Sequence, residues 1–89
     1  MTELDILRGQ IDAIDEKLVE LFESRMELSK KIGDLKIQKG LEILNSKREE
    51  ELIKKGISNL KDKELSCELE MFLRKIMELS RKVQERRKV

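Results

Sequence analysis

The sequence predicts an all-α protein built from three helices, the first long, the second short and the third long. Apolar residues recur at alternating gaps of three and four, the pattern of a helix packed along its length. Proline is absent and there are four glycines among 89 residues, so little interrupts a helix. Charged residues make up 44% of the chain and aromatic residues 2%, yet the apolar residues are phased, which indicates amphipathic helices rather than disorder.

The first helix is predicted from a capping box, Thr2 with Asp5, to about Lys36. Its length of ~33 residues corresponds to ~50 Å, whereas a compact chain of this size has a radius of gyration of only ~12 Å. The helix therefore overhangs a single chain, and a symmetric dimer is the simplest way to cover its far end. Its apolar stripe comprises Leu4, Leu7, Ile11, Ile14, Leu18, Leu21, Leu28, Ile32 and Leu35.

The remaining two helices follow a predicted loop at residues 40–45, where the apolar pattern breaks. The second helix is expected to run from residue 45 or 46 to about residue 55, with Gly56 as its C-cap. The third is expected to begin at an Asp62 N-cap and to run to about residue 87. We expect residues 1–89 to form a single domain.

Composition narrows the classes of function. The net charge of +1 argues against a general nucleic-acid-binding surface. Histidine is absent, which removes the commonest general base and metal ligand, and Cys67 is alone, which excludes an intrachain disulfide and a multi-cysteine zinc site. No apolar run approaches ~20 residues and no signal peptide is recognisable. We expect a cytoplasmic protein with no cofactor, no membrane association and no bound metal.

One position in the first helix departs from the apolar stripe in an informative way. The residue that continues the stripe after Leu21 is Arg25. A guanidinium stays charged in a protein, and burying one without a partner is very costly. Either a carboxylate such as that of Glu70 or Glu78 pairs with it, or the site awaits an anionic ligand.

Two further cations share this side of the helix. Lys36 lies eleven residues after Arg25, so the two point the same way with Cα atoms ~16 Å apart, close enough for long side chains to surround a small anion. Lys36 could instead offset the helix dipole. Arg8 lies 28 residues before Lys36, ~42 Å away, so it reaches the others only from an antiparallel partner chain, or else is a surface arginine. Gly33 either allows another helix to approach closely or is a neutral change in the sequence with no structural role.

Polar residues on the other helices could complete such a site. Ser80 and Gln84 are four residues apart on a second stripe of the third helix, and Gln84 offers an uncharged amide donor. Arg48 and Glu49 fall in the first turn of the second helix, where they could recognise a hydroxyl. Glu49 has an alternative role, since Ser46 with Glu49 fits a capping box.

These residues together resemble a known family. The first-helix pattern is similar to that of the small all-helical chorismate mutases: Arg8-x-x-Ile11-Asp12-x-Ile14-Asp15-x-x-Leu18-x-x-Leu21-x-x-x-Arg25, then Leu28, Ile32 and Lys36. Arg48-Glu49 resembles the start of the family's second helix, and Ser80-x-x-x-Gln84 resembles its third-helix pair. The resemblance covers nearly the whole chain, in order and with matching spacing.

The resemblance implies an intertwined homodimer with two equivalent active sites that catalyse the Claisen rearrangement of chorismate to prephenate, on the route to phenylalanine and tyrosine. It also implies a role for each matching residue. The implied roles are carboxylate binding by Arg25 and by Arg8 of the partner subunit, hydrogen bonding to the ether oxygen by Lys36 and Gln84, holding of the ring hydroxyl by Glu49 with backbone help near Asn45, and electrostatic support from Arg48 and Ser80.

One departure from the family pattern is Asn45, where many relatives carry an aspartate. Asparagine can still cap the helix, but a carboxylate contact from this position is absent. Two other functions stay open at the level of sequence. An isochorismate-pyruvate lyase uses the same fold and a similar pocket, and a non-catalytic helical dimerisation or regulatory module would need only the apolar stripes.

Overall fold

The computed structural model describes residues 1–88, and within them all regular secondary structure is helical. The predicted order of long, short and long helices is confirmed. The elements are α1 (Glu3–Lys39), α2 (Ser46–Asn59), a 3-10 turn η1 (Lys63–Leu65) and α3 (Ser66–Glu85).

Helix α1 begins with the capping box that the sequence predicts and ends at a glycine. The Thr2 hydroxyl accepts from the backbone N–H of Asp5, and the Asp5 carboxylate accepts from the backbone N–H of Thr2, which is a complete capping box. The helix continues three residues beyond the predicted end at Lys36 and stops at Gly40, whose φ of 69° is the left-handed conformation that glycine adopts without a steric cost.

Two predicted boundaries are wrong. Gly56 lies inside α2 rather than at its end, and a Cβ built there would stand 2.7 Å from Cδ1 of Leu73 on α3. Gly56 is therefore the point at which α3 packs directly on the backbone of α2, not a helix terminus. Asp62 caps the η1 turn instead of α3, which begins at Ser66 and ends at Glu85, two residues short of the prediction.

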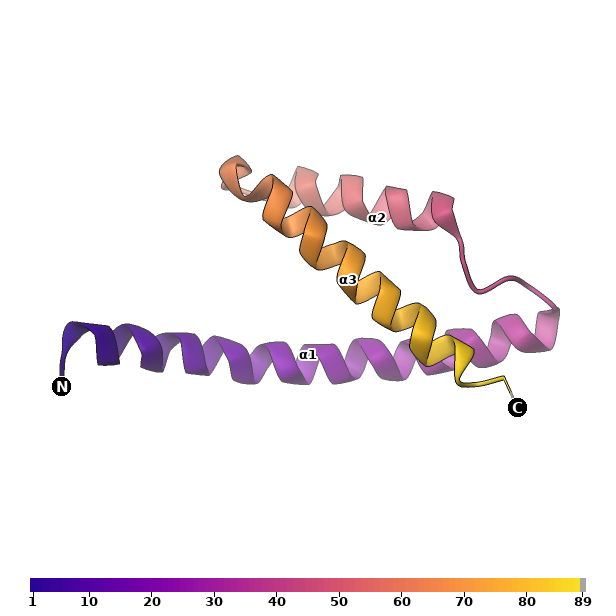
Figure 1. The fold of residues 1–89 in the computed structure, drawn as a ribbon, viewed down its shortest axis with the longest axis horizontal. Helices are drawn as coiled ribbons and strands as arrows, with labels where there is room; N and C mark the ends of the chain where they lie inside the picture. Colours follow the sequence, from indigo (N-terminus) through magenta and orange to yellow (C-terminus); the bar gives the residue numbers. More distant parts are fainter. Residues whose placement is uncertain (89) are drawn as a thin grey trace.

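Helix α3 is the element that joins the other two (Figure 1). It packs against α2 and crosses the C-terminal half of α1, while the N-terminal half of α1 projects away with no neighbour. The chain measures 55 × 27 × 15 Å and its radius of gyration is 16.4 Å, compared with ~12 Å for a compact chain of this length. The overhang that the sequence predicts for the first helix is confirmed.

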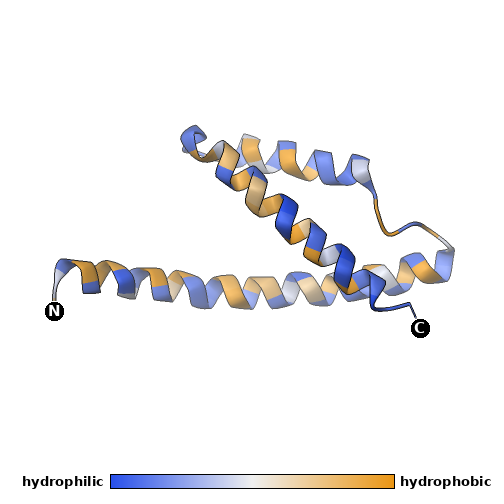
Figure 2. Ribbon diagram, in the orientation of Figure 1, coloured by the Kyte–Doolittle hydropathy of each residue, from blue (hydrophilic) through white to orange (hydrophobic). Residues whose placement is uncertain are grey.

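The buried core of a single chain is correspondingly small. Its apolar members are Met26, Ile43, Ile53 and Met77. The buried residues of α3 are Met77, Ser80 and Gln84. Apolar residues recur along α1 (Figure 2), and its apolar stripe stays exposed, with Leu4, Ile11, Ile14 and Leu21 all more than half accessible.

Candidate functional site

A cavity of about 470 Å³ lies where all three helices approach one another. Three of its lining residues carry a positive charge and none carries a negative charge, so the cavity is suited to an anion. Helix α1 contributes five residues, α2 with its cap contributes three, and α3 contributes one. The lining residues are Arg25, Leu28, Ser29, Ile32, Lys36, Asn45, Arg48, Leu52 and Ser80.

Arg25 stands in this cavity without a carboxylate partner among residues 1–88. Its Nη1 donates a hydrogen bond of 2.6 Å to the Ser80 hydroxyl, which shares a further 2.6 Å hydrogen bond with the buried hydroxyl of Ser29. Burial lowers the pKa of the Arg25 guanidinium from its ordinary value, but arginine remains cationic at neutral pH. The Ser80 hydroxyl, itself held by Ser29, orients the guanidinium without neutralising it.

The carboxylates considered as partners of Arg25 are engaged elsewhere. Glu70 pairs with Arg74 at 2.9 Å, and Glu78 pairs with Lys75 at 3.1 Å. Within residues 1–88 the interpretation of Arg25 as half of a structural ion pair is therefore wrong, and its guanidinium has no counterion there.

Lys36 lies on the same side of α1 and connects the helix to the loop that follows. Its Nζ donates to the backbone carbonyl of Ile43 at 2.6 Å, and Ile43 is itself buried. An ammonium has three donors, so this bond leaves two for a ligand. The contact fixes the ammonium at the cavity wall, a role that the sequence does not reveal because Ile43 acts through its backbone.

The start of α2 supplies one wall of the cavity. The Asn45 side chain accepts from the backbone N–H of Arg48 at 3.1 Å, so Asn45 is the N-cap, as expected for an asparagine replacing aspartate. A capping box between Ser46 and Glu49 is wrong, because Ser46 is already the first helical residue. Glu49 also does not line the cavity; its carboxylate is bound by Arg81 of α3.

Gln84 is brought to the crossing of α1 and α3, next to the cavity but not in its lining. Its side chain is 7% exposed and its Oε1 has no hydrogen-bond partner among residues 1–88. A Cβ built on Gly33 would stand 2.9 Å from the Gln84 Cα, so glycine is what permits the two helices to approach here. Of the two interpretations of Gly33, close packing is the correct one.

The end of α3 is tied to α1 just beyond this crossing. Arg87 donates to both carboxylate oxygens of Asp34, at 2.8 and 3.1 Å. The nearby guanidinium lowers the pKa of the Asp34 carboxyl through its hydrogen bond. Asp34 is the neighbour of Gly33, so the ion pair and the glycine act on the same contact.

Arg8 is the third predicted site residue, after Glu49 and Gln84, that does not line the cavity of a single chain. It is exposed on the free half of α1, and the 17 residues between it and Arg25 correspond to ~26 Å along the helix. Ser29 lines the cavity and is not predicted as a site residue from the sequence. Ser29 lies four residues after Arg25, a spacing that could have identified it.

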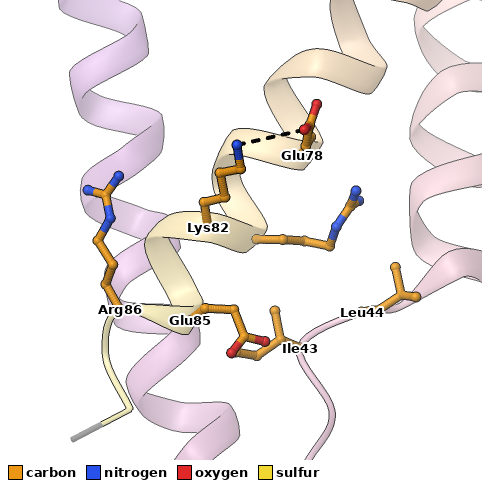
Figure 3. Close-up of a pocket in the computed structure, with 7 residues that line it drawn as sticks. Ile43, Leu44, Glu78, Lys82, Glu85 and Arg86 are labelled. Carbon is orange, nitrogen blue, oxygen red and sulfur yellow. Dashed lines mark ion pairs between the residues drawn. The ribbon is translucent and has the colours of Figure 1, made fainter.

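Two other hollows border the site. The outer one, of about 570 Å³, is lined by acidic and basic residues of α3 together with Ile43 and Leu44 of the connecting loop (Figure 3), and its mixed charge favours no single ligand. An apolar cavity of about 230 Å³ lies at the angle between α1 and α3, and Arg25 is its one charged lining residue. This second cavity adjoins the exposed stripe of α1.

Residues 1–88 contain no group of three or more histidine, cysteine, aspartate or glutamate side chains placed to hold a metal ion. None of the helices in this described part of the chain is long and apolar enough to cross a membrane.

The profile of the family described as chorismate mutase type II matches residues 7–85. The chain belongs to this family. The type II chorismate mutase assignment confirms the predicted family and its all-α class, and the matched range includes each of the eight predicted site residues. No solved structure matched the chain.

The curated relatives that this chain matches are larger proteins. It is 42% identical over 55 residues to the bifunctional chorismate mutase/prephenate dehydratase of Aquifex aeolicus, an alignment that covers 62% of this chain and 15% of that protein. It is 43% identical over 49 residues to the T-protein of Haemophilus influenzae, covering 55% and 13% respectively. A T-protein of Enterobacter agglomerans is 38% identical over 53 residues, covering 60% and 14%. The chain thus spans about one seventh of these relatives.

Proposed function

We propose that this chain is a chorismate mutase that converts chorismate to prephenate in aromatic amino acid biosynthesis. The observation that carries the proposal is Arg25, a cation without a carboxylate partner among residues 1–88. It is held by the Ser80 hydroxyl, which Ser29 supports, in a cavity that also contains Lys36 and Arg48. A structural helix bundle has no use for such an arrangement, because an unpaired, partly buried guanidinium costs stability. A dianionic substrate would offset that cost.

The rearrangement is intramolecular, so it needs no nucleophile or general base from the protein. The substrate must instead be held in a compact, chair-like form, and two arginines fixing two carboxylates can do this. Arg25 is one of the two in this proposal, and Arg8 of the partner subunit is the other. Arg48 adds positive charge at the opposite wall of the cavity.

Negative charge grows on the ether oxygen as the carbon–oxygen bond breaks. In this proposal Lys36 and Gln84 donate hydrogen bonds to that oxygen and stabilise the transition state more than the ground state. The Lys36 ammonium keeps two donors after its bond to the loop carbonyl. The Gln84 amide, whose Oε1 has no partner among residues 1–88, lies at the close crossing of α1 and α3, so little reorganisation is needed. An acceleration of ~10⁶-fold would require ~8 kcal/mol from these effects.

A homodimer is part of the proposal. Two antiparallel copies of α1 would cover the exposed stripes of both chains and bring Arg8 of each toward the cavity of the other. The apolar cavity beside Arg25 lies next to this stripe and would be filled by the same contact. A cytoplasmic location remains a prediction from the sequence.

The test measures the decrease in the ultraviolet absorbance of chorismate after purified protein is added. The product is then converted by acid to phenylpyruvate to confirm its identity. The chain has no Trp or Tyr, so it adds little absorbance of its own. We expect turnover that disappears in Arg25→Ala and survives in Arg74→Ala, a matched change at an exposed ion pair outside the cavity.

A folded protein that turns over isochorismate to salicylate and pyruvate but not chorismate would instead be a lyase. If neither substrate reacts and Arg25→Leu raises stability, the chain is a non-catalytic helical module.

A further inference from the structure

Arg81 and Glu49 form the most buried ion pair among residues 1–88. Nη1 of Arg81 donates to both carboxylate oxygens of Glu49, at 2.6 and 2.5 Å. The two side chains are 32% and 20% exposed, whereas the members of the other ion pairs are 41% or more exposed. The pair joins the first turn of α2 to α3.

The other carboxylates near Arg81 are already engaged. Glu78, which lines the same outer hollow, lies within ion-pair distance of Lys75 and of Lys82, the latter drawn in Figure 3. Glu85 pairs with Lys88 at 3.1 Å. Arg81 is therefore committed to Glu49, and Glu49 is held in one orientation by the shortest ion pair in the described chain.

The pair also has a definite place relative to the anion cavity. Glu49 directly follows Arg48, and Arg81 directly follows Ser80, and both Arg48 and Ser80 line the cavity. The pair thus lies next to the line where α2 meets α3, and both of its members line a neighbouring hollow of about 450 Å³ rather than the cavity itself. A carboxylate has about four acceptor positions and two are used by Arg81, so the others remain for a hydroxyl donor.

We propose that Arg81 is a positioning residue: it fixes the Glu49 carboxylate so that this group accepts the ring hydroxyl of the bound substrate. The inference rests on the proposed function, because it assigns Arg81 to the recognition of that same substrate. A free glutamate side chain loses rotamer freedom when it binds a ligand, which costs entropy. Because Arg81 already restricts the Glu49 side chain, substrate binding costs less of this entropy. Orientation of a ligating group by a residue behind it is a common device in binding sites.

A matched control lies seven residues earlier on α3. Arg74 also joins α3 to α2, through a 3.2 Å hydrogen bond to Glu50, the neighbour of Glu49. Its side chain is 49% exposed and it does not line the anion cavity. If Arg81 only bridges α2 to α3, the same substitution at Arg74 should act in the same way.

The experiment measures kcat and KM for chorismate in Arg81→Met, Arg81→Lys and Arg74→Met, and in Arg81→Met combined with Glu49→Gln. We expect Arg81→Met to raise KM about three- to tenfold and to leave kcat within about twofold, because a hydroxyl contact is held equally in the ground and transition states. The KM of Arg81→Lys should fall between those of the wild type and Arg81→Met, since an ammonium keeps the charge but lacks the planar guanidinium. Arg74→Met should match the wild type. In the Glu49→Gln background, Arg81→Met should have no further effect on KM.

Helix content by circular dichroism and dimer size by gel filtration are measured for each variant, so that a folding defect is recognised; if Arg81→Met does not fold, Arg81→Lys carries the test. An effect of Arg81→Met that persists undiminished in the Glu49→Gln background, or that Arg74→Met reproduces, overturns the inference while chorismate turnover by the wild type sustains the proposed function. A lower KM in Arg81→Met also overturns it, because Arg81 would then withhold Glu49 from the substrate. A wild type that does not turn over chorismate overturns both.

Discussion

The two halves of α1 carry the same apolar pattern but have different surroundings. In the C-terminal half, Met26, Ser29 and Gly33 are buried beneath α3. In the N-terminal half no residue is buried, and Ile11 and Ile14 are 56% and 59% exposed. One chain therefore supplies the cover for only one half of its longest helix.

The same division applies to charge. The covered half of α1 places Arg25 and Lys36 in the anion cavity, while the uncovered half carries Arg8 on an exposed surface. The apolar stripe itself stays exposed in both halves, with Leu28 58% and Ile32 47% exposed. What α3 covers is the neighbouring face that carries Met26, Ser29 and Gly33. We infer that the uncovered half belongs to the partner's site.

The largest effect is expected from Lys36→Ala in the covered half. In the proposed mechanism the Lys36 ammonium faces the ether oxygen, so its loss should lower kcat about 10²- to 10³-fold without dissociating the proposed dimer. Lys39→Ala is the control, because both lysines lie in the last turn of α1 and only Lys36 lines the cavity. The measurement is the kcat of both variants by steady-state kinetics. If kcat falls equally in both, Lys36 only offsets the helix dipole.

The next effect concerns the uncovered half and uses two residues of almost equal exposure. Ile14 is 59% and Val19 is 58% exposed in the single chain, but they are ~140° apart around the helix and only Ile14 belongs to the stripe. Ile14→Asp should weaken the dimer by ~3 kcal/mol or more for each carboxylate that is buried, and Val19→Asp should not. Analytical ultracentrifugation measures this, and dimers of equal strength would count against the stripe as the interface.

Two glycines of α1 give a smaller and more local comparison. A Cβ on Gly33 would meet Gln84, whereas a Cβ on Gly9 would meet nothing within 4 Å. Gly33→Ala should cost ~1–3 kcal/mol of overpacking, partly offset by ~1 kcal/mol of helix propensity, and should lower kcat by displacing Gln84. Gly9→Ala should gain up to ~1 kcal/mol. Denaturant unfolding and kinetics are the readouts; a fully active, stabilised Gly33→Ala variant would refute the close-packing role.

The smallest effect is the pH dependence of the ion pair between Asp34 and Arg87. The folded-state pKa of Asp34 is lowered by its hydrogen bond to Arg87, so its stabilisation is present above the ordinary value of 3.8 and is lost as the pH falls through the folded value. Asp34→Asn should therefore be less stable than the wild type at neutral pH and should approach it in strong acid. A stability difference that widens on acidification would contradict this sign.

Sequence reasoning reaches the fold and the family because both depend on local patterns. Periodicity predicts the three helices, and the positions of Arg25, Lys36, Arg48 and Ser80 on their faces predict that they meet. The errors at Gly56 and Asp62 have a different origin. A glycine that ends a helix and one that admits another helix look alike until the neighbour is known, and Leu73 is seventeen residues away.

The partner of Glu49 was missed for the same reason. Arg81 is one of 20 cations in the chain, and the choice between them depends on how α2 and α3 lie together. The hydrogen bond from Lys36 to the Ile43 carbonyl also cannot be predicted from the sequence, because every residue type has a backbone carbonyl.

The central claim is that each site takes Arg8 from the partner subunit and Lys36 from its own chain, and mixing inactive variants tests it most directly. Arg8→Ala and Lys36→Ala proteins are combined in equal amounts, and subunit exchange is confirmed by native mass spectrometry. Half of the dimers are then hybrids with one intact site of two, so chorismate turnover should recover to about a quarter of the wild-type value. Exchange without any recovery of turnover would contradict a site shared between two chains.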